Sequence, residues 1–104
     1  MNAAAMSKPP RRIWLCADDY GLAPGVNVAI RELILRGRLN ATSVMMAAPH
    51  CGPDEIAALD TLNSGQTRAA LGLHVTLTGP LAPMSAGFVP LRDGAFPPVI
   101  DLLK

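Results

Sequence analysis

Short apolar runs alternate with amphipathic stretches along the first three quarters of the chain. Each run has the length of a strand and is bounded by charged, glycine or proline residues. Between the first two runs, apolar residues recur at offsets of four, seven and eight from Val26. This spacing predicts an amphipathic helix that begins at Pro24 and ends at Arg36 and Gly37. A weaker helix is expected from residue 53 to about residue 62. The predicted strands are residues 13–17, 41–47 and 69–78.

The predicted elements follow one another in the order β-α-β-α-β, with strands spaced by about 30 residues, which indicates parallel strands joined by right-handed crossovers. Residues 13–17 have the composition of a strand buried on both faces. Residues 79–98 hold five of the ten prolines and predict a long irregular loop, and residues 99–104 predict the start of a further helix. Three such strands form an incomplete sheet with an open edge. The sequence therefore predicts an α/β fold that is the truncated beginning of a larger β/α barrel.

The composition is that of a globular protein: half of the 104 residues are apolar and 16% are charged. The net charge is +1 and the basic residues are dispersed, so a nucleic-acid partner is not expected. No run approaches the roughly 18 apolar residues of a membrane span, and none is expected. Two cysteines form no disulfide framework, which favours the cytoplasm. Residues 1–11 are predicted to be a disordered leader before a domain at residues 12–104.

Candidate catalytic residues occur at the carboxyl ends of the predicted strands, where α/β proteins assemble their active sites. Asp18 and Asp19 follow the first strand, and consecutive side chains on a strand point in different directions. One acid can then bind a metal while the other approaches the metal's water. Alternatively, the pair is a helix N-cap followed by a solvated acid.

The third predicted strand alternates strictly between leucine or valine at odd positions and glycine, histidine or threonine at even positions, from Leu71 to Thr78. His74 lies on the more polar face, which indicates a pocket rather than a packed wall. A lone histidine of this kind is often a hydrogen-bonded core residue. Its combination with an acidic end of the first strand favours a metal ligand instead.

Other residues with reactive or metal-binding side chains are interpreted as structural. His50 is expected in an ordinary turn after the second strand. Cys16 stands inside an apolar run and is expected to be a buried, inert thiol. Met45 and Met46 are expected to contribute to the core.

Three ordered blocks give the chain its resemblance to a known family: residues 17–22 with 24–27, residues 41–45 and residues 72–78. Over residues 12 to about 103, the chain resembles the YdjC-like (ChbG/HpnK) carbohydrate deacetylases. The resemblance implies the N-terminal portion of a NodB-like incomplete β/α barrel, and a divalent metal that serves in removing an N-acetyl group from a sugar. It also implies that Asp19 is a metal-binding carboxylate, Asp18 the general base and His74 the first metal-binding histidine. The second histidine ligand and the catalytic acid of the family would lie beyond Lys104.

The implied cofactor is a divalent ion, and a mixed histidine and carboxylate shell is compatible with magnesium, zinc, manganese or cobalt. Two protein ligands are fewer than the three of a usual catalytic zinc site, so weak binding and little turnover by this chain are expected. The implied substrate is an N-acetylated sugar, either chitooligosaccharide-like or hopanoid-linked. An open sheet edge also favours self-association into a homo-oligomer.

Three other interpretations stay open. A phosphoacceptor receiver domain has a similar length and an acid pair after its first strand, but its third strand would end in an aspartate rather than in His74. The chain could also be a non-catalytic fragment that acts as a binding module. A third alternative is an amidohydrolase that uses the same metal site on a substrate other than a sugar.

Overall fold

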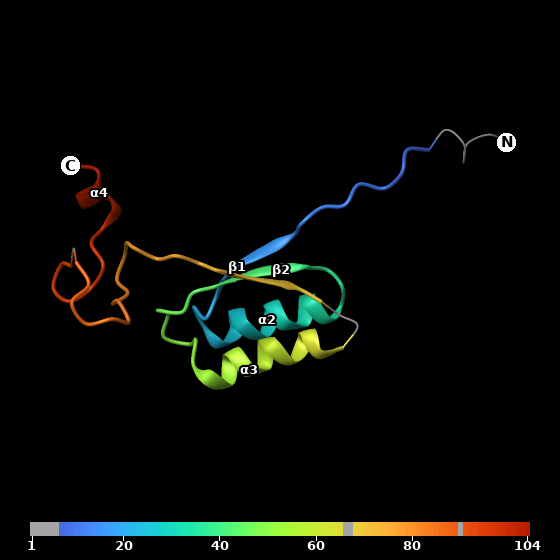
Figure 1. Ribbon diagram of the computed structural model, residues 1–104, viewed down its shortest axis with the longest axis horizontal. Helices are drawn as coiled ribbons and strands as arrows, with labels where there is room; N and C mark the ends of the chain where they lie inside the picture. Colours follow the sequence, from blue (N-terminus) through green and yellow to red (C-terminus); the bar gives the residue numbers. More distant parts are fainter. Residues whose placement is uncertain (1–6, 66–67, 90) are drawn as a thin grey trace.

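The computed structural model describes residues 7–65, 68–89 and 91–104, and Figure 1 shows their arrangement. The elements are β1 (Cys16–Tyr20), α2 (Pro24–Leu35), β2 (Ala41–Val44), α3 (Pro53–Thr61), a 3-10 turn η1 (Leu62–Ser64), β3 (Ala70–Leu73) and α4 (Val99–Leu102). The helix at α2 was predicted from the apolar spacing and the weaker helix at α3 from its acidic first turn, and the positions of both are confirmed. The end of α2 is also as predicted, because Arg36 caps the helix and Gly37 adopts a left-handed φ of 68°.

The three strands are parallel and lie in the order β1-β2-β3, which confirms the predicted α/β arrangement. Figure 1 shows α2 and α3 on the same face of the sheet. Each crossover therefore adds the next strand beside the previous one, with its helix on one side, as in a β/α barrel. A receiver domain needs a doubly wound sheet in which the first strand lies between the second and the third. The observed strand order excludes this arrangement for the three strands.

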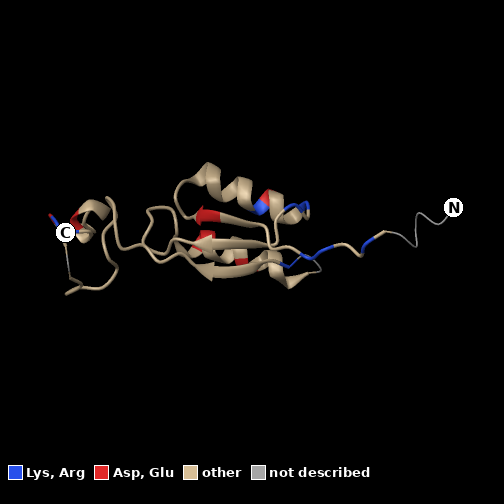
Figure 2. Ribbon diagram, turned by 90° about the horizontal axis from the view of Figure 1, so that it is seen from above, with Lys and Arg blue, Asp and Glu red and all other residues tan. Residues whose placement is uncertain are grey.

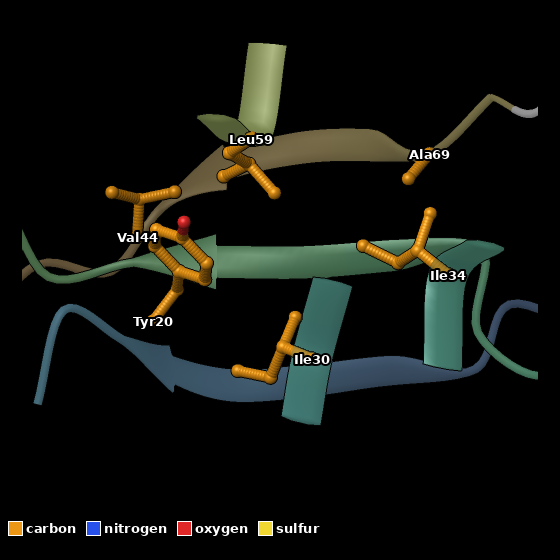
Figure 3. Packing of buried hydrophobic residues seen from close by; sticks show 6 residues of the cluster. All are labelled: Tyr20, Ile30, Ile34, Val44, Leu59 and Ala69. Atoms are coloured by element: carbon orange, nitrogen blue, oxygen red, sulfur yellow. The ribbon is translucent and has the colours of Figure 1, made fainter. Parts of the chain in front are cut away.

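The core lies between this sheet and the two helices (Figure 3). Its buried side chains are Tyr20, Ile30, Ile34, Val44, Leu59 and Ala69. The buried stripe of α2 differs from the predicted one, because Asn27 replaces Val26 as its first fully buried member and Leu33 is 40% exposed. Burial of these aliphatic side chains supplies most of the favourable free energy that holds α2 and α3 on the sheet.

The first strand begins later than predicted. Its pairing with β2 starts at Cys16, opposite Ala41, and the residues before it leave the sheet. Ile13, Trp14 and Leu15 are 51–74% exposed, so the expectation of a strand at residues 13–17 buried on both faces is wrong. The physical reason is that no layer among the described residues packs against this run. The second and third strands are also shorter than predicted, ending at Val44 and Leu73.

The apolar side chains of β3 and the residues after it are exposed. Leu71 and Leu73 are 42% and 68% exposed, and Val75 and Leu77 are at least half exposed. By register, Leu71 and Leu73 pair with Thr42 and Val44, which are buried on the helix side of the sheet. The two leucines therefore face the helix layer but extend past it, along an open apolar groove of about 720 Å³ beside α3.

Segments at both ends of the chain extend away from the sheet (Figure 1). The radius of gyration is 18.5 Å, compared with about 13 Å for a compact chain of this length. Of the predicted leader, residues 1–6 lie outside the described residues, and residues 7–11 are exposed without helix or strand. The predicted irregular loop is present, with an edge-to-face contact between Phe88 and Phe96. Among the described residues, no helix has the length and apolar character needed to cross a membrane.

Candidate metal centre

The residues predicted to bind a metal, Asp19 and His74, and the predicted general base, Asp18, lie at one end of the sheet. Asp18 and Asp19 belong to β1 itself, rather than following it, because the strand extends to Tyr20. In Figure 2, where acidic residues are red, one of the strands ends in a red arrowhead. His74 follows β3 directly, and its backbone N–H donates to the carbonyl of Val44 at 2.9 Å. Because parallel strands all end on the same side of the sheet, the acids and the imidazole lie at the same rim.

Polar atoms from all three strands meet there. Asp19 Oδ1 lies 3.3 Å from His74 Nδ1, and the two side chains are 45% and 32% exposed. Ser43 of β2 lies between the neighbouring strands, with its hydroxyl 3.1 Å from Asp18 Oδ1 and 3.3 Å from His74 Nδ1. The structure thus brings together all three predicted site residues and adds Ser43, which the sequence analysis did not single out.

An irregularity in β1 explains why two consecutive acids reach one site. Ala17 pairs with Thr42 and Tyr20 pairs with Val44, so Asp18 and Asp19 together oppose the single residue Ser43. This is a β-bulge, which kinks a strand and re-aims its side chains. Asp19 has a left-handed φ of 70°, a conformation that aspartate tolerates better than most residues.

The distances fit a shared divalent ion. Two ligands bound at 2.0–2.1 Å to a tetrahedral ion lie about 3.4 Å apart, close to the 3.3 Å between Asp19 Oδ1 and His74 Nδ1. One carboxylate and one imidazole suit zinc, manganese, cobalt or magnesium. In the part of the chain that the structure describes, no group of three or more histidine, cysteine or acidic residues is placed to hold an ion. The described residues therefore offer two protein ligands of these types at this rim.

The same atoms do not form a catalytic triad. In a serine hydrolase the hydroxyl and the carboxylate bind opposite nitrogens of the histidine ring. Here Ser43 Oγ and Asp19 Oδ1 both face Nδ1 of His74. A proton relay from serine through the ring to the acid is therefore not available in this geometry.

The loops below the rim are held together by a buried asparagine. Asn27 is fully buried; its Oδ1 accepts from the backbone N–H of Gly21 at 2.6 Å, and its Nδ2 donates to the carbonyl of His50 at 2.9 Å. Gly21 has a φ of 107°, and a Cβ at this position would lie 2.8 Å from Cys51 Cβ. The close approach requires glycine. Asn27 thus fastens the turn after β1 to the turn after β2.

A polar network on the other side of the sheet joins α2 to α3. The hydroxyl of Tyr20 donates to the carbonyl of Glu55 at 2.7 Å and accepts from Arg31 at 2.8 Å, and Arg31 forms an ion pair with Glu55. Burial raises the pKa of Tyr20, although Arg31 opposes the change. The hydrogen bond from Arg31 holds the pKa of Glu55 below its ordinary value. This network supports the packing of the helices and lies away from the candidate metal centre.

Of the residues interpreted as structural, His50 lies in an exposed turn and Met45 is buried, as predicted. The prediction for Cys16 is wrong: the thiol is exposed, because β1 only begins at this residue, and it lies 4.0 Å from Asp18 Oδ1. Met46 is 40% exposed beside the apolar groove, so it is not a core residue. Ser43 has the opposite parity to Thr42 and Val44 along the strand, but alternation alone does not distinguish a serine at a site from any other serine.

The strands are parallel, carry helices on one face and have a cluster of acidic and imidazole side chains at their carboxyl ends. These features define a segment of an α/β barrel-type protein. The chain belongs to the YdjC-like protein family, whose sequence pattern matches residues 12–102. Its fold is similar to that of a crystal structure from Enterococcus faecalis, described as a candidate cellobiose-phosphate cleavage protein. The two share 24% sequence identity and a TM-score of 0.60, over 82% of this chain and 33% of that chain. This chain thus spans about a third of that structure. No curated protein gives a significant match.

Proposed function

We propose that this chain carries part of the active site of a divalent-metal hydrolase that removes N-acetyl groups from a carbohydrate. The observation that carries the proposal is the contact between Asp19 Oδ1 and His74 Nδ1 at 3.3 Å, with Asp18 beside it. The separation of these two atoms suits a pair of ligands to one ion. Membership of the YdjC-like family and the resemblance of the three sequence blocks to carbohydrate deacetylases support the choice of reaction.

Three residues of this chain have separate roles in the proposed reaction. Asp19 and His74 would hold a divalent ion, which supplies a Lewis acid for the amide carbonyl and lowers the pKa of water. Asp18 is exposed at the same rim, and one of its oxygens is hydrogen-bonded to Ser43. Its other oxygen would accept a proton from the water that attacks the amide carbon, as a general base. The proton can later be returned to the amine that leaves.

A carbohydrate is proposed as the substrate class on two grounds. The structural relative from Enterococcus faecalis is described in terms of a phosphorylated disaccharide, and the sequence blocks resemble enzymes that act on acetylated sugars. The rim is also open on the side of the sheet that α2 and α3 leave uncovered (Figure 1), which gives a sugar access to it. A cytoplasmic location and self-association through the open sheet edge stay predictions.

Metal binding is the first test of this proposal. Calorimetric titrations with zinc, manganese, cobalt and magnesium should show one site in the wild type. Asp19→Ala and His74→Ala should each weaken the affinity at least about tenfold, since each removes a ligand. His50→Ala and Asp54→Ala are matched controls, because both residues are exposed and lie elsewhere. Equal affinity in all five proteins would refute the assignment of Asp19 and His74.

Acetate release is the second test. N-acetylglucosamine oligomers should release acetate only in the presence of the ion, whereas cellobiose phosphate, which carries no acetyl group, should give no acetate. Asp18→Asn should lower the rate by about 10²- to 10⁴-fold, the usual contribution of a positioned general base. Its metal affinity should stay close to that of the wild type. Cleavage of cellobiose phosphate without loss of acetate from the oligomers would contradict the proposed reaction.

A further inference from the structure

Ser43 lies in the middle of the candidate metal centre, although it is not one of the site residues predicted from the sequence. It lies on β2, between β1, which carries Asp18, and β3, which His74 follows directly, and it is partly buried. Its Oγ is 3.1 Å from Asp18 Oδ1 and 3.3 Å from His74 Nδ1. A single hydroxyl therefore contacts the proposed general base on one side and the proposed metal ligand on the other.

The direction of these contacts follows from the number of protons. A serine hydroxyl has one proton to donate, and an ionised carboxylate can only accept. The proton of Ser43 therefore goes to Asp18, and in the metal-free protein a lone pair of the oxygen accepts a hydrogen bond from Nδ1–H of His74. Charge-assisted hydrogen bonds to carboxylates are stronger than neutral ones. The contact with Asp18 is thus the stronger of the two, and it holds one oxygen of that side chain toward β2.

We propose that Ser43 is a positioning residue that fixes Asp18 and His74 relative to each other, an inference that rests on the proposed metal-dependent function. By engaging Asp18, it keeps that acid beside the ion site as a base and leaves Asp19 to face His74. In the metal-free protein its contact with Nδ1 of His74 limits rotation of the imidazole away from Asp19, so the ring is already oriented when an ion replaces the proton on Nδ1. Residues that orient metal ligands change metal affinity about 10- to 100-fold when they are removed.

Three variants test this role. Ser43→Ala removes the hydroxyl, Ser43→Thr retains it on a side chain that strands favour, and Ser64→Ala removes an exposed hydroxyl that donates to the carbonyl of Thr61. Zinc affinity is measured by calorimetry for each. The ring nitrogens of His74 are followed by NMR in the metal-free proteins, which reports the contact without any ion or any turnover. Urea denaturation of the same samples identifies variants that fail to fold.

We expect Ser43→Ala to weaken zinc binding about tenfold or more and to shift the ring signals of His74. Ser43→Thr should stay within about threefold of the wild type, and Ser64→Ala should match it. Wild-type affinity in a folded Ser43→Ala protein would overturn the positioning role while leaving the proposed function intact. Unchanged ring signals in Ser43→Ala would likewise overturn it. If the wild type binds no ion although the ring signals shift, the proposed function fails, and the positioning role fails with it.

Discussion

Replacement of Asn27 by alanine should destabilise the fold more than its size suggests. The side chain is fully buried and bridges the turns after β1 and β2. Asn27→Ala leaves the buried backbone N–H of Gly21 without its partner and removes the bond to the carbonyl of His50, which lies in an exposed turn. The two losses are therefore unequal, because water can replace only the second partner.

The magnitude can be estimated from these two contacts. An unsatisfied buried N–H costs about 1–3 kcal/mol, and loss of a bond that water can replace costs about 0.5–1.5 kcal/mol. Asn27→Ala should therefore lower the free energy of unfolding by about 2–4 kcal/mol. Asn63 offers a matched control, because it also makes two bonds to backbone, to the N–H and the carbonyl of Ala69, but its side chain is only partly buried. Asn63→Ala should cost about 1–3 kcal/mol.

Urea denaturation at neutral pH, followed by circular dichroism, measures both values by linear extrapolation. A domain of this size has a free energy of unfolding of about 5–15 kcal/mol, so both variants should remain measurable or nearly so. Loss of structure without urea in Asn27→Ala, with Asn63→Ala folded, would mean that the cost exceeds this estimate. The reasoning would be refuted if Asn27→Ala cost no more than Asn63→Ala.

Three further predictions concern single sites. Glu55→Gln should lower the free energy of unfolding at neutral pH, because the ion pair with Arg31 is lost. The difference from wild type should vanish as the pH falls through the depressed pKa of Glu55, since protonation then removes the ion pair from the wild type as well. Unfolding midpoints measured from pH 7 to pH 3 test this. Gly21→Ala should lower the free energy of unfolding by about 1–3 kcal/mol, because Gly21 has a φ of 107°. Gly25→Ala on α2 is the control: nothing lies within 4 Å of a Cβ at this position, so the same denaturation measurement should show no change or a gain in stability. Asp19→Gly should abolish metal binding but leave the free energy of unfolding unchanged or up to about 1 kcal/mol higher, because glycine adopts the left-handed φ of this residue without strain. A fall in stability would argue against strain at Asp19.

The helices could be predicted from sequence because local signals specify them. Pro24 at the first turn and Gly37 just beyond the end fix the limits of α2, and both signals act within the helix itself. The limits of β1 could not be predicted in this way. Trp14 and its neighbours are as apolar as a buried strand, but burial depends on a packing partner, and sequence pattern does not show where the partner lies.

The candidate site was predictable in part for the same reason. Alternation on the third strand marked His74, and the acid pair marked the end of the first strand. Ser43 was not marked, since a serine in a strand has no distinctive local signal. Its place beside His74 follows from the register in which Ser43 pairs with Gly72, a long-range property of the sheet. The acidic residues and the histidine of the candidate site could therefore be predicted from the sequence, but not the neutral residue between them.

The bulge in β1 links the fold to the proposed chemistry. In a regular strand, alternation would place Asp18 and Asp19 on opposite faces of the sheet, and only one acid could reach the ion. The bulge sets both acids opposite Ser43, and the left-handed φ of Asp19 redirects its carboxylate toward His74. A non-glycine residue in this conformation costs about 1–2 kcal/mol, and such strain is typical of functional sites. A strained bulge would therefore give one strand both the proposed ligand and the proposed base, so that two adjacent acids could serve a single ion without both binding it.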